Sequence, residues 1–180
     1  WSQLFPDIHD ESYEGFVDFV DDLDPNKVVY HNPYTLVKSD DGMATVQSIK
    51  MNPISGLMND FMVLENGDYA VLAGSFYYSS DEGQSWTETQ TSEIDGLTMI
   101  ELDGAIYVAY QAIMRSIDGG VTFDTVFNDD VIKRKFVNLD GKLILATLND
   151  LLKSEDGGTT WEPIPAVDYY GYGDHLIAHK

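Results

Sequence analysis

Ser116-Ile-Asp-Gly-Gly-Val-Thr-Phe123 is one of four similar stretches in this chain of 180 residues. The others are Ser79-Ser-Asp-Glu-Gly-Gln-Ser-Trp86, Ser154-Glu-Asp-Gly-Gly-Thr-Thr-Trp161 and a more divergent Ser39-Asp-Asp-Gly-Met-Ala-Thr-Val46. Their first serines lie 40, 37 and 38 residues apart (79 − 39, 116 − 79 and 154 − 116). A fixed period in this range is typical of solenoids, propellers and other repeat arrays. We call each of the four segments a repeat turn.

The residues of the repeat turns predict a structural role. A tight turn needs a residue that tolerates positive φ, and glycine does so without a Cβ penalty. An aspartate two residues before that glycine can accept hydrogen bonds from the backbone N–H groups of the turn. The alternative, aspartates acting as catalytic acids or metal ligands, is disfavoured because they occur one per repeat. The structural set is Ser39, Asp41, Ser79, Asp81, Gly83, Trp86, Ser116, Asp118, Gly120, Phe123, Ser154, Asp156, Gly158 and Trp161.

Short apolar runs and Asn-Gly or Asp-Gly turns predict four antiparallel strands in each repeat. Asn66-Gly67 is expected to form a type I′ turn. The repeat turn that contains Met43 in place of the glycine is expected to be the least regular of the four. The predicted strands are 16–20, 27–30, 34–39 and 45–50; 60–64, 69–73, 76–79 and 85–89; 97–102, 105–110, 113–116 and 122–127; and 135–139, 142–147, 151–154 and 160–164.

Four antiparallel strands about every 40 residues are typical of a propeller blade. The sequence therefore predicts an all-β fold, a single β-propeller over residues 1–180 with about four complete four-stranded blades. The repeats cover approximately residues 15–50, 59–90, 97–127 and 135–165. Partial strands are expected at residues 1–6 and 174–180, so we expect a fragment of a larger propeller.

Charge narrows the range of partners. Ten Lys and Arg against 31 Asp and Glu give a net charge of −21, which repels phosphate backbones and anionic lipid surfaces. Nucleic acid is therefore not expected as a partner. No apolar run approaches the roughly 20 residues that a membrane-spanning helix needs. Cysteine is absent, so disulfides and thiolate metal sites play no part.

The pattern Ser-x-Asp-x-Gly-x-Ser/Thr-aromatic resembles the Asp box, also called the bacterial neuraminidase repeat. Proteins with this repeat include sialidases, xyloglucan-cleaving glycosidases, sortilin-type receptors and photosystem II assembly factors. Asp24-Pro-Asn-Lys-Val-Val-Tyr30, followed by Leu36-Val-Lys-Ser39, is most similar to the sortilin and photosystem-assembly style. The resemblance covers about residues 15–165 and implies a propeller, with the Asp-box residues in structural roles.

Catalytic and metal signatures are weak. The sialidases of this group bind the substrate carboxylate with three arginines, whereas this chain has only Arg115 and Arg134. A glycosidase needs two carboxylates that flank the scissile bond, and 31 acidic residues make such a pair uninformative. No catalytic residue is assigned, and the histidines fit no zinc pattern. A weak Ca²⁺ site is a possibility at one acidic run, made of Asp18, Asp21, Asp22 and Asp24.

Blade topology places the repeat turns at one end of the sheets and the loops around the axis at the other. Tyrosines carry rigid apolar faces with a polar tip and suit sugar or protein surfaces; packing between blades is the alternative for them. For the basic run that begins at residue 133, neutralisation of Asp129 and Asp130 is the alternative to binding. The ligand-binding candidates are Tyr110, Gln111, Lys133, Arg134 and Tyr170.

The leading hypothesis is a non-catalytic binding or scaffold propeller of a secreted or cell-surface protein. It would recognise a protein or a glycan through the end opposite the repeat turns, in an extracellular, cell-surface or periplasmic setting. One alternative is a sialidase-like or xyloglucanase-like glycoside hydrolase whose catalytic groups lie partly outside this sequence. A further alternative is an assembly subunit whose end strands are completed by neighbouring chains.

Overall fold

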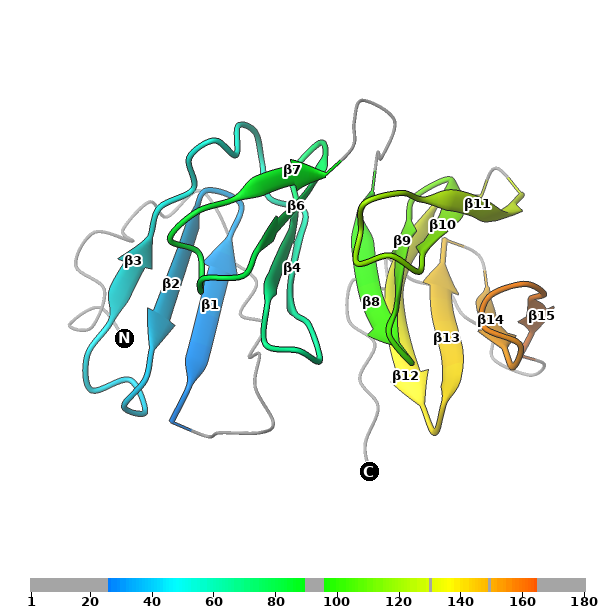
Figure 1. Ribbon diagram of the computed structural model, residues 1–180. Helices are drawn as coiled ribbons and strands as arrows, with labels where there is room; N and C mark the ends of the chain where they lie inside the picture. The colour runs from blue at the N-terminus through cyan, green and yellow to red at the C-terminus, as the bar shows by residue number, and fades with distance from the viewer. Residues whose placement is uncertain (1–25, 90–95, 130, 149, 165–180) are drawn as a thin grey trace. The chain divides into compact units, whose positions relative to one another are not determined.

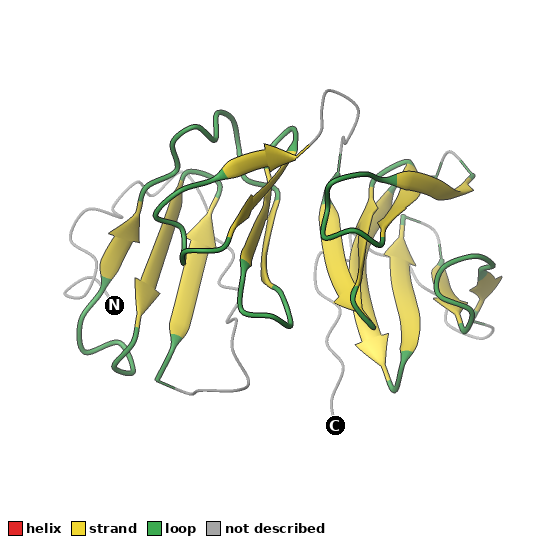
Figure 2. Ribbon diagram, viewed as in Figure 1, coloured by secondary structure: helices red, strands yellow, loops and turns green. Residues whose placement is uncertain are grey.

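A computed structural model describes residues 26–89, 96–129, 131–148 and 150–164 of the chain (Figure 1). The regular secondary structure in these ranges is entirely β-strand, as Figure 2 shows. These ranges contain no helix that could cross a membrane. The chain forms two compact units, Trp1–Ser48 and Ile49–Lys180.

The first unit contains most of sheet 1, in which three strands lie in chain order. The strands are β1 (Val28–Asn32), β2 (Thr35–Ser39) and β3 (Gln47–Ile49), whose last residue belongs to the second unit. β1 and β2 are antiparallel, with Asn32 opposite Thr35 at the connection between them. The strand predicted at residues 16–20 lies outside the described residues.

The second unit contains three sheets of four antiparallel strands, each in chain order. Sheet 2 consists of β4 (Asp60–Val63), β5 (Tyr69–Leu72), β6 (Phe76–Ser79) and β7 (Thr87–Thr89). Sheet 3 consists of β8 (Thr98–Leu102), β9 (Ala105–Ala109), β10 (Ala112–Ser116) and β11 (Asp124–Asn128). Sheet 4 consists of β12 (Lys133–Leu139), β13 (Lys142–Thr147), β14 (Leu151–Ser154) and β15 (Glu162–Pro163).

The hairpins between the first two strands of sheets 2, 3 and 4 are of two kinds. Asp103 and Gly104 both have positive φ, at 52° and 73°, as a type I′ turn requires. The type I′ prediction for Asn66-Gly67 is wrong, because only Gly67 of the two has positive φ. Here the Gly67 N–H donates to Leu64 O at 2.8 Å, and the glycine closes a longer loop in the left-handed region. The dipeptide was identified correctly, but loop length decides the turn type.

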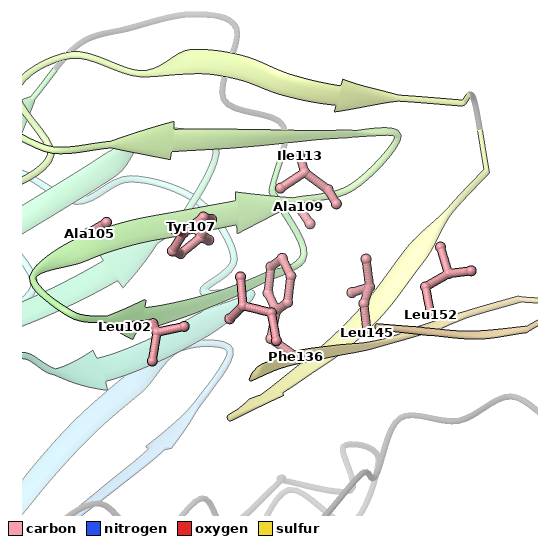
Figure 3. Close-up of a cluster of buried hydrophobic side chains, with 9 residues drawn as sticks. Leu102, Ala105, Tyr107, Ala109, Ile113, Phe136, Leu145 and Leu152 are labelled. Carbon is pink, nitrogen blue, oxygen red and sulfur yellow. The ribbon is translucent and has the colours of Figure 1, made fainter. Parts of the chain in front are cut away.

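Apolar side chains fill the spaces between consecutive sheets of the second unit. The first strands are neighbours, since β4 contacts β8 and β8 contacts β12. One cluster joins sheets 2 and 3 and contains Leu64, Ala70, Leu72, Phe76, Met99, Ile106 and Val108. A second joins sheets 3 and 4 (Figure 3) and contains Leu102, Ala105, Tyr107, Ala109, Ile113, Phe136, Leu143, Leu145 and Leu152. β5 and β9 are buried along their whole length because both faces of each strand are covered.

Candidate functional site

The third repeat turn is held by a closed set of hydrogen bonds. The Ser116 hydroxyl donates to Asp118 Oδ1 at 2.8 Å and accepts the Gly120 N–H at 2.8 Å. Asp118 Oδ1 also accepts the Thr122 N–H at 2.9 Å, and Oδ2 accepts the Thr122 hydroxyl at 2.6 Å. The serine is buried. Both carboxylate oxygens are thus bound within the turn that carries them.

The same set of bonds recurs in the other three repeat turns. The N–H of the fifth residue donates to the first serine at 2.8 Å in each case. The hydroxyl of the seventh residue donates to the aspartate Oδ2 at 2.6 to 2.7 Å. The residues involved are Ser39, Asp41, Met43 and Thr45; Ser79, Asp81, Gly83 and Ser85; and Ser154, Asp156, Gly158 and Thr160.

These hydrogen bonds favour the ionised form of the aspartates. The hydroxyls of Ser85, Thr122 and Thr160 are the largest cause of a pKa lowered to about 2 in the second, third and fourth turns. In the first turn the Thr45 N–H is the largest cause of the lowered pKa of Asp41. At neutral pH these carboxylates carry no proton, so they suit a structural role better than that of a general acid.

Three repeat turns also require glycine because another side chain approaches closely. A Cβ at Gly120 would lie 2.3 Å from the Phe76 ring, and one at Gly83 would lie 2.3 Å from the Ile49 side chain. At Gly158 the nearest atom, of the Tyr107 ring, would be 3.0 Å away. Phe76 belongs to sheet 2 and Tyr107 to sheet 3, so the third and fourth turns each pack on the preceding sheet.

The first repeat turn is regular, and the prediction that it would be the least regular is wrong. Met43 adopts a φ of 73°, in the left-handed region, and its N–H donates to the Ser39 hydroxyl at 2.8 Å. A non-glycine residue in this region costs about 1–2 kcal/mol, and the bonds of the turn hold it there. The hydrogen-bonded serine and aspartate therefore dictate the turn more strongly than the glycine does.

The aromatic residues that end three of the turns pack in different ways. Trp86 Nε1 donates to Lys50 O at 2.9 Å, whereas Trp161 Nε1 donates to Gly158 O, within its own turn, at 3.0 Å. Phe123 forms an edge contact with Phe76, with the ring centroids 5.3 Å apart. The shared aromatic position thus fills the space under each turn without fixing one partner.

At the end of the sheets opposite the repeat turns, Lys133 is fully buried. Its ammonium group contacts the Asp129 carboxylate and donates to Gln111 O, and it lies 5.6 Å from the centre of the Phe127 ring. Its N–H donates to Tyr110 O at 2.7 Å. The Lys133 side chain therefore has a structural role, because it fixes the connection between sheets 3 and 4. Its ion pair with Asp129 agrees with the alternative reading of the basic run, in which Lys133 neutralises a nearby aspartate instead of binding a ligand.

The other ligand-binding candidates differ in exposure. Gln111 is exposed and Tyr110 is partly buried in the connection between β9 and β10. Arg134 is partly buried in β12, next to an irregularity in the pairing with β13. Tyr170 lies outside the described residues. Of the five candidates, the structure brings Tyr110, Gln111 and Lys133 together.

Sequence reasoning missed a polar cluster on the first strands of the three sheets. Asp60, Thr98 and Lys135 occupy equivalent positions, each paired with the residue near the end of the second strand: Leu72, Ala109 and Ala146. The buried Asp60 carboxylate accepts the Met99 N–H at 2.8 Å and lies 3.6 Å from Lys135 Nζ. Aligning the repeats strand by strand, rather than turn by turn, would have drawn attention to this position.

Glu101 was also missed, and its pKa is raised. Burial is the main cause, opposed by the Glu65 N–H, which donates to Glu101 Oε2 at 2.6 Å. Glu65 follows β4, and Glu101 lies in β8, so this bond joins sheets 2 and 3. Nothing in the local sequence distinguishes Glu101 from the many other acidic residues of the chain.

No metal centre can be assembled from the described part of the chain, where no three His, Cys, Asp or Glu side chains gather. The acidic run considered for Ca²⁺, Asp18, Asp21, Asp22 and Asp24, lies outside the described residues.

Comparison with solved structures identifies the fold. The GH74 enzyme of Niastella koreensis matches with a TM-score of 0.62 and 24% identity, over 81% of this chain and 23% of that one. YCF48 bound to a D1 peptide matches with a TM-score of 0.57 and 13% identity, over 76% and 48%. The extracellular domain of BT4673 from B. thetaiotaomicron matches with a TM-score of 0.64 and 8% identity, over 79% and 21%. The chain has a β-propeller fold.

This similarity concerns the fold alone, since all three identities are below 25%. The chain spans between about a fifth and a half of the length of these structures. No protein-family profile and no curated protein matches it. The four-stranded sheets in chain order, with their first strands in contact, are the propeller blades that the repeats predicted.

Proposed function

We propose that this chain is a non-catalytic binding or scaffold segment of a β-propeller, recognising a protein or a glycan through the end opposite the repeat turns. We assign the repeat turns to the Asp-box type and the chain to a secreted or cell-surface protein. The Asp-box assignment is supported by the shared serine, aspartate and glycine contacts. The setting is supported by the high acidity and by similar structures that include an extracellular domain.

The contrast between the two ends of the sheets carries this proposal. In the repeat turns, the hydroxyls and carboxylates that the four turns share bind their own turn, which leaves them few free acceptor positions. At the opposite end, Lys133 fixes the backbone at Gln111 while the Gln111 side chain remains exposed. An exposed side-chain amide can both donate and accept hydrogen bonds. Because the loop that carries it is already fixed, binding a partner costs little loop entropy.

The partner class follows from the charge and the side chains. A net charge of −21 disfavours polyanions, so neutral glycans and neutral or basic peptide segments are preferred. Tyr110 adds an aromatic face beside Gln111. The similar structure of YCF48 contains a bound peptide, and the resemblance of the repeat turns to those of xyloglucan-cleaving glycosidases is the reason to include glucans in the test.

Binding can be tested by titrating the chain with neutral β-glucan oligosaccharides, sialosides and short peptides, using calorimetry. For any ligand that binds, Y110A/Q111A is expected to weaken the affinity by about tenfold or more, the scale of a lost anchor residue. S80A, at an exposed position of the second repeat turn, is the matched control and should leave the affinity unchanged. Equal affinity of Y110A/Q111A and the parent chain would contradict the proposed binding end.

The hydrolase alternative is tested by following product release from the same glucans and sialosides. The similarity to GH74 enzymes is the observation that favours it. We expect no turnover above the spontaneous rate. Turnover that disappears in D150N, a variant of an exposed carboxylate at the opposite end, would make the chain an enzyme and overturn the proposal.

A further inference from the structure

The third repeat turn differs from the other three in what it presents to solvent. Its second and sixth residues are Ile117 and Val121, with exposed fractions of 75% and 55%. The corresponding pairs are polar or small in the other turns: Asp40 and Ala44, Ser80 and Gln84, and Glu155 and Thr159. The side chains that close the turn by hydrogen bonds are those of Ser116, Asp118 and Thr122, so turn formation does not require aliphatic residues at positions 117 and 121.

The backbone that carries the Ile117 and Val121 side chains is fixed by hydrogen bonds and packing. Between them lie Asp118 and Gly120, whose contacts with Ser116 and Thr122 fix the backbone. Gly120 in turn lies against the Phe76 ring of the neighbouring sheet. A partner that covers Ile117 and Val121 would therefore gain apolar burial without having to order a loop.

The surroundings of this pair are acidic. The segment from Asp103 to Asp124 contains three aspartates and one cation, Arg115. Asp103 lies at the same end of sheet 3 as the turn, because Leu102 is opposite Ala105 and Ser116 is opposite Ile106. Arg115 lies 5.8 Å from the centre of the Tyr107 ring. Ile117 and Val121 thus expose apolar surface that is flanked by negatively charged side chains.

We infer that Ile117 and Val121 form a second docking surface, for a basic protein segment that carries an aliphatic or aromatic side chain between cationic ones. Charge complementarity selects this occupant, because the cations would face Asp103, Asp118 and Asp124 while the apolar group covers the pair. A second copy of this chain is disfavoured, since it would bring another −21 charge to the same surface. This surface is independent of the binding end proposed above.

The test uses the whole chain and two synthetic peptides, one of alternating lysine and leucine and one of alternating glutamate and leucine. The lysine peptide is expected to shift the methyl NMR signals of Ile117 and Val121, and the glutamate peptide is not. I117S/V121Q gives the third turn the residues that the second turn has at Ser80 and Gln84, so it should fold normally. We expect it to bind the lysine peptide at least about tenfold more weakly, as loss of two buried aliphatic groups implies.

S80A/Q84A is the matched control, because it alters the same two positions of the second turn without removing an apolar pair. It should bind the lysine peptide like the parent chain. If I117S/V121Q also binds like the parent, the attraction is general electrostatics and the docking surface is refuted. Methyl signals of Ile117 and Val121 that do not move in the parent chain would refute it as well, whatever the variants do.

Discussion

The two ends of sheets 3 and 4 are stabilised by different kinds of contact. At the repeat turns, residues within one segment bind one another, as Ser116, Asp118 and Thr122 do. At the opposite end, one buried cation, Lys133, joins a carboxylate four residues before it to a carbonyl group 22 residues before it. The first end is therefore specified locally, and the second depends on groups brought together by the fold.

This difference affects how the chain can diversify. A turn closed by its own residues can be repeated in every blade, and its exposed positions, such as Ile117 and Val121, can vary without loss of the turn. A loop fixed by a long-range contact, such as the loop at Gln111, can present its own side chains for recognition.

The largest effect is expected for Gly120→Ala. The new Cβ would lie 2.3 Å from the Phe76 ring, which is itself fully buried, and φ is 88°. Overpacking and left-handed strain together should lower the free energy of unfolding by about 3–5 kcal/mol. Gly119→Ala is the matched control, because φ is 75° and no atom lies within 4 Å of its Cβ position. It should cost only about 1–2 kcal/mol in denaturant titrations. Equal losses would show that sheet packing does not require the glycine.

Lys133→Met is expected to have the next largest effect. It leaves Gln111 O without its buried donor and Asp129 without its cation, which should cost about 2–4 kcal/mol. Lys142→Met is the control: its partner Glu155 is 2.7 Å away, but both side chains are about half exposed. That pair should contribute little to stability, because solvent screens an exposed ion pair. Similar melting temperatures for the two variants would refute the claim that Lys133 organises the opposite end.

Acid should weaken the repeat turns in a defined pH range. The pKa of Asp118 is about 2 in the folded chain, against a usual value of 3.8, because hydroxyl and N–H groups stabilise the carboxylate. A lowered folded-state pKa gives stability that is present above the unfolded pKa and lost as pH falls through the folded one. Stability should therefore fall between about pH 4 and about pH 2. Asp118→Asn should reduce this dependence, measured by urea titration at each pH; an unchanged slope would contradict the assignment.

The smallest effect is expected for Glu101→Gln. The pKa of Glu101 is raised, mainly by burial, so ionisation opposes folding as pH rises through that pKa. The glutamine keeps an oxygen that can accept the Glu65 N–H. The variant should match the parent chain at low pH and be slightly more stable at pH 7. A less stable variant at pH 7 would show that the charge itself holds sheets 2 and 3.

Much of the fold could be predicted from the sequence because the repeat turns are local. The positions of Ser116, Asp118 and Gly120 predicted a turn, the blade period and the four-stranded sheets. The regularity of the turn at Met43 does not follow from the glycine pattern, because the serine and aspartate bonds hold the turn without a glycine there. The glycine has a second role, close packing on Phe76, that only the arrangement of neighbouring sheets reveals.

The opposite end was less predictable for the same physical reason. Lys133, Arg134 and Lys135 are adjacent in sequence and predict one basic group. In the fold, Lys133 is buried against Asp129, while Lys135 approaches Asp60 of another sheet. Residues two apart share a face of a regular strand, but the pairing of β12 with β13 shifts register between Lys133 and Lys135. Sequence proximity therefore does not make a common site.

Native-state hydrogen exchange at the repeat turns tests most directly whether the serines and aspartates serve the fold. The N–H groups of Gly83, Gly120 and Gly158 each donate to a buried serine hydroxyl at 2.8 Å. We predict that these three amides exchange as slowly as those of the inner strands, and that Ser116→Ala accelerates exchange at Gly120 alone. If the Gly120 amide already exchanges in the parent chain as fast as in the variant, the hydroxyl does not hold the turn, and the account is contradicted.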